Sequence, residues 1–163
     1  MIRVFIAAPL ARGRHASIIA GALRVNFDVT STWHDNLNGY PKDPRDEEER
    51  LSKLSTNLSA IERSDVLVAL LHDGEPRCTF FEIGYACARG GAVVCVHDSG
   101  AGRFLGDAHA LVVKLDLRRQ SLEDLPLAIE TAAGLVGIDI HQRDTMPDLV
   151  APEGRMERGL ENA

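Results

Sequence analysis

Short, largely apolar segments alternate with amphipathic ones along most of this chain, and this alternation constrains the fold more than any other feature. Asp65–Leu71 (DVLVALL) and Ala92–His97 (AVVCVH) are almost continuously apolar, which is typical of strands covered on both faces. Parallel strands joined by helices produce such a pattern. Strands are predicted, in chain order, at Ile2–Ala8, Phe27–Ser31, Asp65–Leu71, Ala92–His97 and Ala110–Leu115.

The segments between these strands have the periodicity of amphipathic helices. Helices are expected at Ala16–Val25, from near Pro44 through Ile61, at Thr79–Arg89 and at Ser121–Val136. Gly90 and Gly91 are expected to end the third of them. The apolar stripes that we expect to face the sheet are Ile18, Ile19, Ala22 and Leu23 in the first helix and Leu51, Leu54, Leu58 and Ile61 in the second.

About five parallel strands with interleaved helices form a single-domain, doubly wound α/β sheet. The 163 residues suffice for one such domain, which we expect to span residues 1–143. Residues 144–163 are polar, and we expect a C-terminal tail that is loosely ordered or docks on a partner subunit. Sheets of this class bind ligands at the carboxyl ends of their strands, near the point where the strand order reverses.

The net charge of −6 limits the partners that the chain can bind. Binding to duplex DNA needs a surplus of Lys and Arg, so we expect no nucleic-acid polymer, whereas one nucleotide needs only local donors. No apolar segment approaches the length of a membrane helix. Cys78, Cys87 and Cys95 form no C-x-x-C pair and fit a reducing compartment. We therefore expect a cytoplasmic protein without membrane contact.

The sequence carries no familiar cofactor or metal motif. The glycines of Gly100–Gly106 are spaced one residue too far apart for a dinucleotide fingerprint, and there is no phosphate-binding P-loop. The six histidines lack metal-ligand spacing, and no G-x-S-x-G nucleophile elbow occurs. We expect neither a cofactor nor a metal. Cys78 precedes a helix, where a thiol can be activated, but no base is evident beside it.

Glu82 is the carboxylate best placed for chemistry, in the expected first turn of the helix after the central strand. A helix N-terminus stabilises an ionised carboxylate, which suits a nucleophile that attacks a sugar carbon. Glu82 also completes the capping-box pattern Thr79-Phe-Phe-Glu82, in which it would only satisfy a backbone amide. Spacing alone favours the cap, and both interpretations stay open.

Two segments together carry a family resemblance. Asp65-Val-Leu-Val-Ala-Leu-Leu is followed, after a short loop, by Thr79-Phe-Phe-Glu82-Ile-Gly84-Tyr85-Ala86. This arrangement resembles the nucleoside 2-deoxyribosyltransferase family, whose members read A-D-v-v-v-a, a loop, and G-t-x-x-E-x-G-x-A. The opening Val4–Leu10 and the stretch Val29–Trp33 are similar to the first two strands of that family or of its small members.

The resemblance implies a flavodoxin-like fold and an enzyme that cleaves the N-glycosidic bond of 2′-deoxynucleosides or their 5′-monophosphates. Glu82 matches the family nucleophile, which attacks C1′ and forms a glycosyl-enzyme ester. A second base or water then accepts the sugar. The implied partners are a small-molecule nucleoside or nucleotide and neighbouring copies of the chain, in a homodimer or larger homo-oligomer that completes each pocket.

Three residues depart from the family pattern. Asn57 stands where the family usually has an Asp, and an amide can hold a hydroxyl but cannot shuttle a proton. Pro76 replaces a second Asp that handles the base in the transferases, with Glu75 beside it, which favours hydrolysis over transfer. Cys78 replaces a Gly, which alters the approach of the backbone to the sugar.

Other candidate residues follow from their positions near the strand ends. The small side chains of Ala7, Ala8 and Pro9 would line the floor under the sugar. Trp33 either stacks on a base or packs in the core or an interface. Arg12, with Arg14, His15 and Ser17 nearby, either meets a 5′-phosphate at the helix start or is merely solvated.

The remaining candidates lie around Glu82. Tyr85, one helical step beyond Glu82, either orients its carboxylate or packs in the core. Cys78 and Thr79 are further substrate-binding candidates at the helix start, and Asp73 borders the loop over the site. His97 and Asp98 end the fourth strand, where they would touch a ligand or a neighbouring subunit.

Two other functional classes were weighed against the enzyme. A catalytically silent nucleotide-binding module would use the same pocket for sensing, and Asn57 and Pro76 favour it. A phosphorylatable receiver domain shares the sheet order but needs an acidic cluster after its first strand. Arg12 and Arg14 occupy that place.

Overall fold

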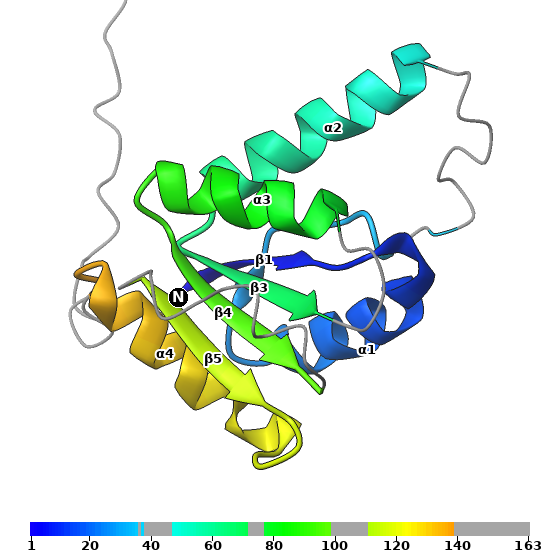
Figure 1. Ribbon diagram of the computed structural model, residues 1–163. Coiled ribbons are helices and arrows are strands. Elements are labelled where there is room, and N and C mark those ends of the chain that lie inside the picture. Colours follow the sequence, from blue (N-terminus) through cyan, green and yellow to red (C-terminus); the bar gives the residue numbers. More distant parts are fainter. Residues whose placement is uncertain (36, 38–46, 72–76, 99–110, 139–163) are drawn as a thin grey trace, which may run out of the picture.

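The computed structural model describes residues 1–35, 37, 47–71, 77–98 and 111–138. Within these ranges the strands form one all-parallel sheet in the order β2-β1-β3-β4-β5, with helices on both faces (Figure 1). The order is that of the flavodoxin-like doubly wound fold, so the predicted fold class is confirmed. The strands are β1 (Arg3–Ala7), β2 (Asp28–Val29), β3 (Val66–Leu71), β4 (Ala92–His97) and β5 (Val112–Asp116).

The helices lie in two layers. Helices α2 and α3 cover one face of the sheet, and α1 and α4 cover the other (Figure 1). Short 3₁₀ turns, η1 (Leu10–Arg12) and η4 (Leu122–Asp124), lead into α1 and α4. The helices are α1 (Gly13–Leu23), α2 (Glu47–Glu62), α3 (Arg77–Ala88) and α4 (Leu125–Leu135). No helix among the described residues is long and apolar enough to cross a bilayer.

Alternating side chains of the central strands build a separate core on each face. Along β3, Val66, Val68 and Leu70 join the core under α1 and α4, whereas Leu67, Ala69 and Leu71 join the core under α2 and α3. Every residue of β3 and of β4 is buried, as the continuous apolar runs predict.

The order of the strands reverses between β1 and β3. The chain leaves β1 for β2 on one side, and then returns to add β3 on the other. The helices that follow these two strands, α1 and α3, therefore lie on opposite faces (Figure 1). Ala7 at the end of β1 pairs with Ala69, and β3 continues for two residues beyond it. This step in the carboxyl edge is where such folds bind ligands.

The end of α3 agrees with its predicted glycine stop. Gly90 has φ of 77°, in the left-handed region that glycine adopts without strain. Its N–H donates to the carbonyl of Cys87, and the N–H of Gly91 donates to the carbonyl of Ala86. This pair of bonds closes the helix and turns the chain directly into β4.

The predicted buried face of the first helix is confirmed for Leu23, which is buried, and for Ile19, which packs against the core, but it is wrong for Ile18 and Ala22. Ile18 is 65% exposed, and Ala22 is also exposed, whereas the buried stripe consists of Gly13, Ala16, Ala20 and Leu23. Small residues on the inner face let a helix backbone lie close to a sheet, so the larger Ile18 is turned outward. The helix also begins earlier than Ala16, at Gly13.

The apolar stripe of the second helix is only half buried. Ile61 and Ala60 are in the core, and Leu58 packs against it. Leu51 and Leu54 are 58% and 42% exposed, because the first half of α2 extends beyond the edge of the sheet (Figure 1). The expectation that all four apolar residues face the sheet is therefore wrong for these two leucines.

Candidate functional site

Glu82 lies two residues further into its helix than expected. Helix α3 begins at Arg77 rather than Thr79, so Glu82 is its sixth residue. The electrostatic effect of a helix N-terminus falls off within the first turn, and therefore gives this carboxylate little help. The predicted stabilisation of the ionised form by the helix start is corrected on this ground.

Thr79 does not cap the helix. It is the third residue of α3 and is fully buried, and its Oγ1 makes no hydrogen bond within the described residues. A capping box requires the threonine to precede the helix and accept a bond from its backbone. The capping interpretation of Glu82 is therefore wrong, and a buried hydroxyl and a carboxylate lie three residues apart on one side of α3.

The carboxylate of Glu82 is half-buried and has no hydrogen-bond or ion-pair partner in the described part of the chain. Burial raises its pKa to about 7, because the surrounding protein solvates the ionised form less well than water does. A buried acid without a structural partner is uncommon in a folded domain, and such groups cluster at functional sites.

Tyr85 contacts a different acid from the one expected. Its hydroxyl donates a 2.5 Å hydrogen bond to Oε1 of Glu62 on α2, and its ring stacks on Phe81. This bond raises the pKa of the Tyr85 hydroxyl, since it favours the protonated form. Arg89 lies over the same ring. The structure thus joins Tyr85 to the seam between α2 and α3, and not to Glu82.

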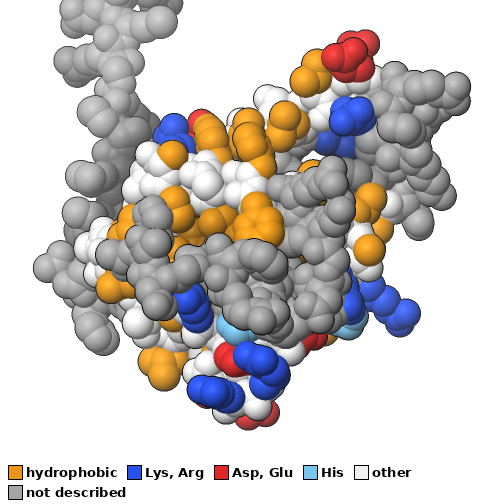
Figure 2. Space-filling model, viewed as in Figure 1, with side chains coloured by type: hydrophobic (Ala, Val, Ile, Leu, Met, Phe, Trp, Pro, Cys, Tyr) orange, Lys and Arg blue, Asp and Glu red, His pale blue; other side chains and the backbone are white. Residues whose placement is uncertain are grey.

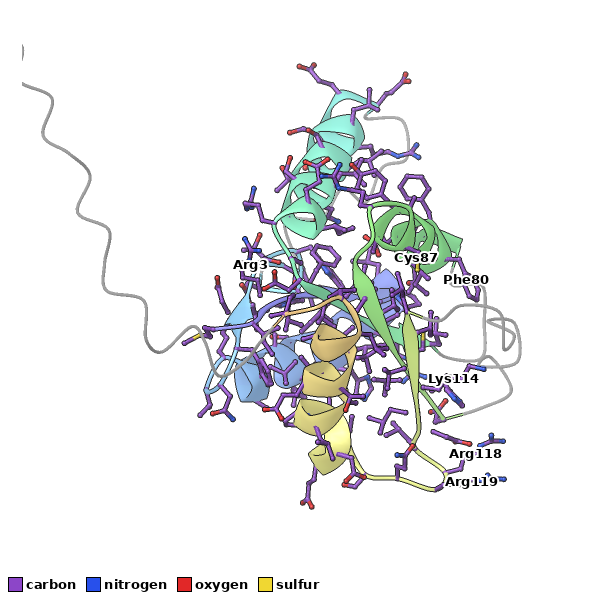
Figure 3. The ribbon with its side chains drawn as sticks, turned by 90° about the vertical axis from the view of Figure 1, so that its left-hand side faces the viewer. Arg3, Phe80, Cys87, Lys114, Arg118 and Arg119 are labelled. Carbon is purple, nitrogen blue, oxygen red and sulfur yellow. The ribbon has the colours of Figure 1, made fainter. Side chains whose placement is uncertain are left out.

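The Tyr85–Glu62 bond also shows which way Glu82 faces. Residues three apart lie on the same side of a helix, so Glu82 is on the α2 side of α3. Phe80 and Cys87 occupy the opposite flank of α3, away from α2 (Figure 3). Both helices run from the carboxyl edge of the sheet toward its amino edge (Figure 1).

Asn57 shares this seam. It is half-buried on α2, one turn before the buried Ile61. From the Tyr85–Glu62 bond, Asn57 lies about 7.5 Å back along α2 and Glu82 about 4.5 Å back along α3. Both residues are therefore displaced from that bond in the same direction, toward the carboxyl edge.

The expected floor of the site is the end of β1. Ala7 is fully buried under α2 and α3, and Ala8 packs against the core on the opposite face. Ala8 and Pro9 are half-buried. The three small residues thus lie at the carboxyl end of β1, next to the reversal point of the sheet.

Side chains after β2 hold the end of β1 in place. The N–H of Ile6 donates to Oγ of Ser31 over 3.1 Å, and Nε1 of Trp33 donates to the carbonyl of Ile6 over 2.7 Å. Ser31 and His34 are buried polar residues. The sequence does not single out either residue, because Ser31 binds a backbone group 25 residues away and His34 acts through Ser31.

Comparison with solved structures found a chain of similar fold. The chain superposes on the 2-deoxyribosyltransferase of the psychrotolerant bacterium Bacillus psychrosaccharolyticus with a TM-score of 0.55 and 16% identity, over 76% of this chain and 89% of that one. The two proteins share a fold. No protein-family model and no curated protein matches the sequence.

On this deoxyribosyltransferase-like fold, Arg12 lies on the other side of the sheet edge from Glu82. Arg12 and His15 line a hollow of about 220 Å³ together with His97 and Asp98 at the end of β4. The hollow opens at the carboxyl edge under α1. Arg14 is exposed, and the described contacts do not bring it into this hollow.

The other expected residues divide into two groups. Cys78 is exposed at the start of α3. Asp73, Glu75 and Pro76 lie outside the described residues, as do the predicted tail and the start predicted for the second helix. Among the residues that are described, no group of His, Cys, Asp or Glu side chains is arranged to hold a metal ion.

Proposed function

We propose that the protein is an enzyme that breaks the N-glycosidic bond of a 2′-deoxynucleoside or its 5′-monophosphate, with Glu82 as nucleophile. The observation that carries this proposal is the half-buried carboxylate of Glu82, which has no partner among the described residues and belongs to the helix that follows β3, a strand next to the reversal point. The likeness in fold to a 2-deoxyribosyltransferase, together with the Glu-Ile-Gly-Tyr-Ala motif, supports it.

The chemistry follows from the state of this carboxylate. Ionised Glu82 attacks C1′, the C1′–N bond breaks, and its electron pair leaves with the base, which takes up a proton. The resulting glycosyl ester is then cleaved by water or by a second base, and the carboxylate is regenerated. With a pKa of about 7, a large share of Glu82 is ionised at neutral pH. Its desolvated oxygens are more reactive than those of a hydrated carboxylate.

The surrounding residues take roles that match their positions. Ala7, Ala8 and Pro9 form the floor under the deoxyribose, and Trp33 stacks on the base with the part of its ring that the core leaves exposed. Asn57 holds a sugar hydroxyl from α2. Cys78, which is exposed at the start of α3, contributes a contact to the substrate, whereas Thr79 has no exposed surface and supports the site from within the core. Asp73 is a further proposed contact.

A 5′-phosphate, where the substrate carries one, is held by Arg12 at the mouth of the hollow under α1. Tyr85 acts on Glu82 indirectly, by fixing α3 against α2 through Glu62. No cofactor enters this reaction, because the nucleophile and the leaving group are supplied by the chain and by the substrate.

The protein works as a homodimer or larger homo-oligomer in the cytoplasm. Apolar side chains gather over α2 and α3 on the surface seen in Figure 2. Leu51, Leu54 and Phe81, which is 53% exposed, are the large apolar residues there. Exposed apolar side chains that gather on one surface suit a contact between two copies of the chain. Sedimentation of Leu54→Glu against the unaltered protein tests it, with a shift to monomer expected.

The decisive experiment offers the protein a panel of 2′-deoxynucleosides and their 5′-monophosphates, with and without a second free base. Liquid chromatography then detects released or exchanged base. We expect release from at least one substrate, and its loss in Glu82→Gln and Glu82→Ala. Glu130→Gln, an exposed acid on α4, is the matched control and should keep full activity.

A trapping experiment separates the enzyme from a silent nucleotide-binding module. The protein is incubated with a 2′-fluoro-2′-deoxynucleoside, which slows hydrolysis of a glycosyl ester, and its mass is measured. A sugar adduct on Glu82 supports the enzyme. Binding without an adduct and without base release from any panel member overturns it in favour of the silent module.

A further inference from the structure

The second strand pairs with β1 over only two residues, and side chains continue the pairing. Backbone bonds join the strands as far as the N–H of Thr30 and the carbonyl of Val4. Beyond that point Ser31 and Trp33 take over, and bind the N–H and the carbonyl of Ile6 with side-chain atoms. Both polar backbone groups of one residue are thus held from the same neighbouring segment.

His34 occupies the centre of this arrangement. It is 2% exposed, and its Nε2 lies 2.9 Å from Oγ of Ser31. Because Ser31 already accepts a hydrogen from Ile6, its own hydroxyl hydrogen is available for Nε2. The hydrogen of the neutral ring is then on Nδ1, which lies 3.2 Å from Oδ1 of Asp35.

Asp35 is itself fixed from the outside. Nη2 of Arg24, near the end of α1, lies 3.0 and 2.7 Å from its two carboxylate oxygens. The pairing with Arg24 lowers the pKa of Asp35, which keeps a negative charge beside Nδ1 of His34. A chain of polar contacts therefore runs from the surface through His34 and Ser31 to the backbone of Ile6.

The order Ser31, His34, Asp35 has the connectivity of a hydrolytic triad but not its accessibility. Ser31 has no exposed surface, so its hydroxyl cannot reach a substrate. It instead bonds the residue directly before Ala7, where the floor of the candidate site begins. The network therefore orients the backbone of Ile6 and does not attack a substrate.

We propose that His34 is a positioning residue that fixes the carboxyl end of β1 through Ser31, and thereby sets the position of Ala7 and Ala8 relative to Glu82. The link to catalysis rests on the function proposed above. The claim that His34 fixes β1 does not depend on that function, because it can be measured in the protein without substrate. We call Ser31, Trp33 and His34 the β1 clamp.

Two substitutions of His34 separate its contacts. His34→Gln places an amide oxygen near the position of Nε2 and keeps an acceptor for Ser31. His34→Asn keeps a donor near the position of Nδ1, toward Asp35, but leaves Ser31 without its acceptor. Ser31→Ala removes the bond to Ile6 directly. Ile129→Val, in the core under α4, controls for general loss of stability.

The first experiment tests the hydrogen bonds of the β1 clamp in the absence of substrate. Amide hydrogen exchange of Ile6 is followed by NMR, together with emission from Trp33, the only tryptophan in the chain. We expect Ile6 to exchange at least tenfold faster in Ser31→Ala and His34→Asn than in the unaltered protein. His34→Gln and Ile129→Val should stay within about threefold. Trp33 emission should shift to longer wavelength only in Ser31→Ala and His34→Asn.

Base release is then measured on the same proteins. We expect kcat to fall about tenfold in Ser31→Ala and His34→Asn with little change in KM, and to recover in His34→Gln, because misplaced reacting groups slow the chemical step. A general loss of stability would affect Ile129→Val equally and would not be rescued by Gln.

Each result decides a separate point. Unchanged exchange of Ile6 in Ser31→Ala overturns the clamp. Faster exchange with unchanged kcat overturns the positioning role. If the unaltered protein releases no base from any substrate, the proposed function fails while the exchange data still decide whether His34 fixes β1.

Discussion

The indole Nε1–H of Trp33 donates a 2.7 Å hydrogen bond to the carbonyl oxygen of Ile6. The contact joins the loop after β2 to the penultimate residue of β1, and the ring packs against the cores on both faces of the sheet. Trp33 therefore has a structural partner at the point where a ligand would meet the sheet. Its remaining exposed surface is the part that a base can stack on.

Trp33→Phe should lower the free energy of unfolding by about 1 to 3 kcal/mol, since it leaves a part-buried carbonyl without its donor and removes packed volume. Urea denaturation followed by circular dichroism measures this. Tyr85→Phe is the matched control: it also removes one aromatic donor, but from an exposed bond to Glu62. A cost for Trp33→Phe no larger than that of the control would mean that the indole bond contributes nothing.

Base release should depend on the ionisation of Glu82. Burial raises its pKa to about 7, and only the ionised form is nucleophilic. We expect kcat/KM to rise about tenfold per pH unit below pH 7 and to level off above it. Initial rates between pH 5 and 9 give the profile. A plateau that already begins at pH 5 would contradict either the raised pKa or the role of Glu82.

Glu82→Gln should make the protein more stable at alkaline pH. Because the folded-state pKa lies above the ordinary value of 4.5, the native protein binds more protons than the unfolded one between these values. Stability therefore falls as pH rises from about 4.5 to about 7. Removing the charge should add up to about 3 kcal/mol at pH 8 and almost nothing at pH 4. Denaturation curves at both pH values measure the difference, with Glu130→Gln for comparison.

Protonation of His34 should destabilise the fold. Desolvation lowers its pKa below the ordinary 6.5, against the opposing effect of Asp35, so the native state favours the neutral ring. A protonated ring would also lose its capacity to accept from Ser31. Stability should accordingly be lost as pH falls through about 6.5 toward the lower native value. His34→Gln should flatten this part of the profile, whereas replacement of the exposed His15 by Gln should leave it in place.

Asp65 should be the most important carboxylate for stability at the amino edge of the sheet. It is buried, and it accepts from the backbone N–H, Nε and Nη2 of Arg3 over 2.9, 3.2 and 2.6 Å. Asp65→Ala should cost about 2 kcal/mol, because it leaves several donors unpaired at once. Glu49→Ala, which breaks the i,i+4 pair with Lys53 on α2, should cost less than about 0.5 kcal/mol. Equal costs would refute this ranking.

The sheet could be predicted because its signal is local. Continuous apolar runs such as Val66–Leu71 have no stable position except between two layers of helices, and Ala92–His97 was predicted with its observed bounds. Helix faces were harder to predict. Hydrophobic size suggests Ile18 as a core residue, but Ala16 and Ala20 face the sheet instead, because close packing of a helix depends on the shape of both surfaces.

The choice of Glu82 as a candidate also rests on a local signal, the Glu-Ile-Gly-Tyr-Ala motif in the helix after the central strand, and its role in a site stays a prediction. Its position toward the carboxyl edge follows from the fold. The direction of its pKa shift does not, since that depends on burial by distant segments and on where α3 begins. The bond between Tyr85 and Glu62, which lie 23 residues apart, likewise has no local signal.

The sequence by itself thus determined the class of the fold, the succession of its buried strands and the candidate nucleophile. These depend on hydrophobic periodicity and on short motifs, which neighbouring residues carry together. Only the tertiary structure decided that Glu82 has no partner among the residues that the structure describes, that Tyr85 binds another acid and that Ser31 and Trp33 bind the end of β1. Such contacts arise from the packing of whole layers, in which residues far apart in the chain come within hydrogen-bond distance.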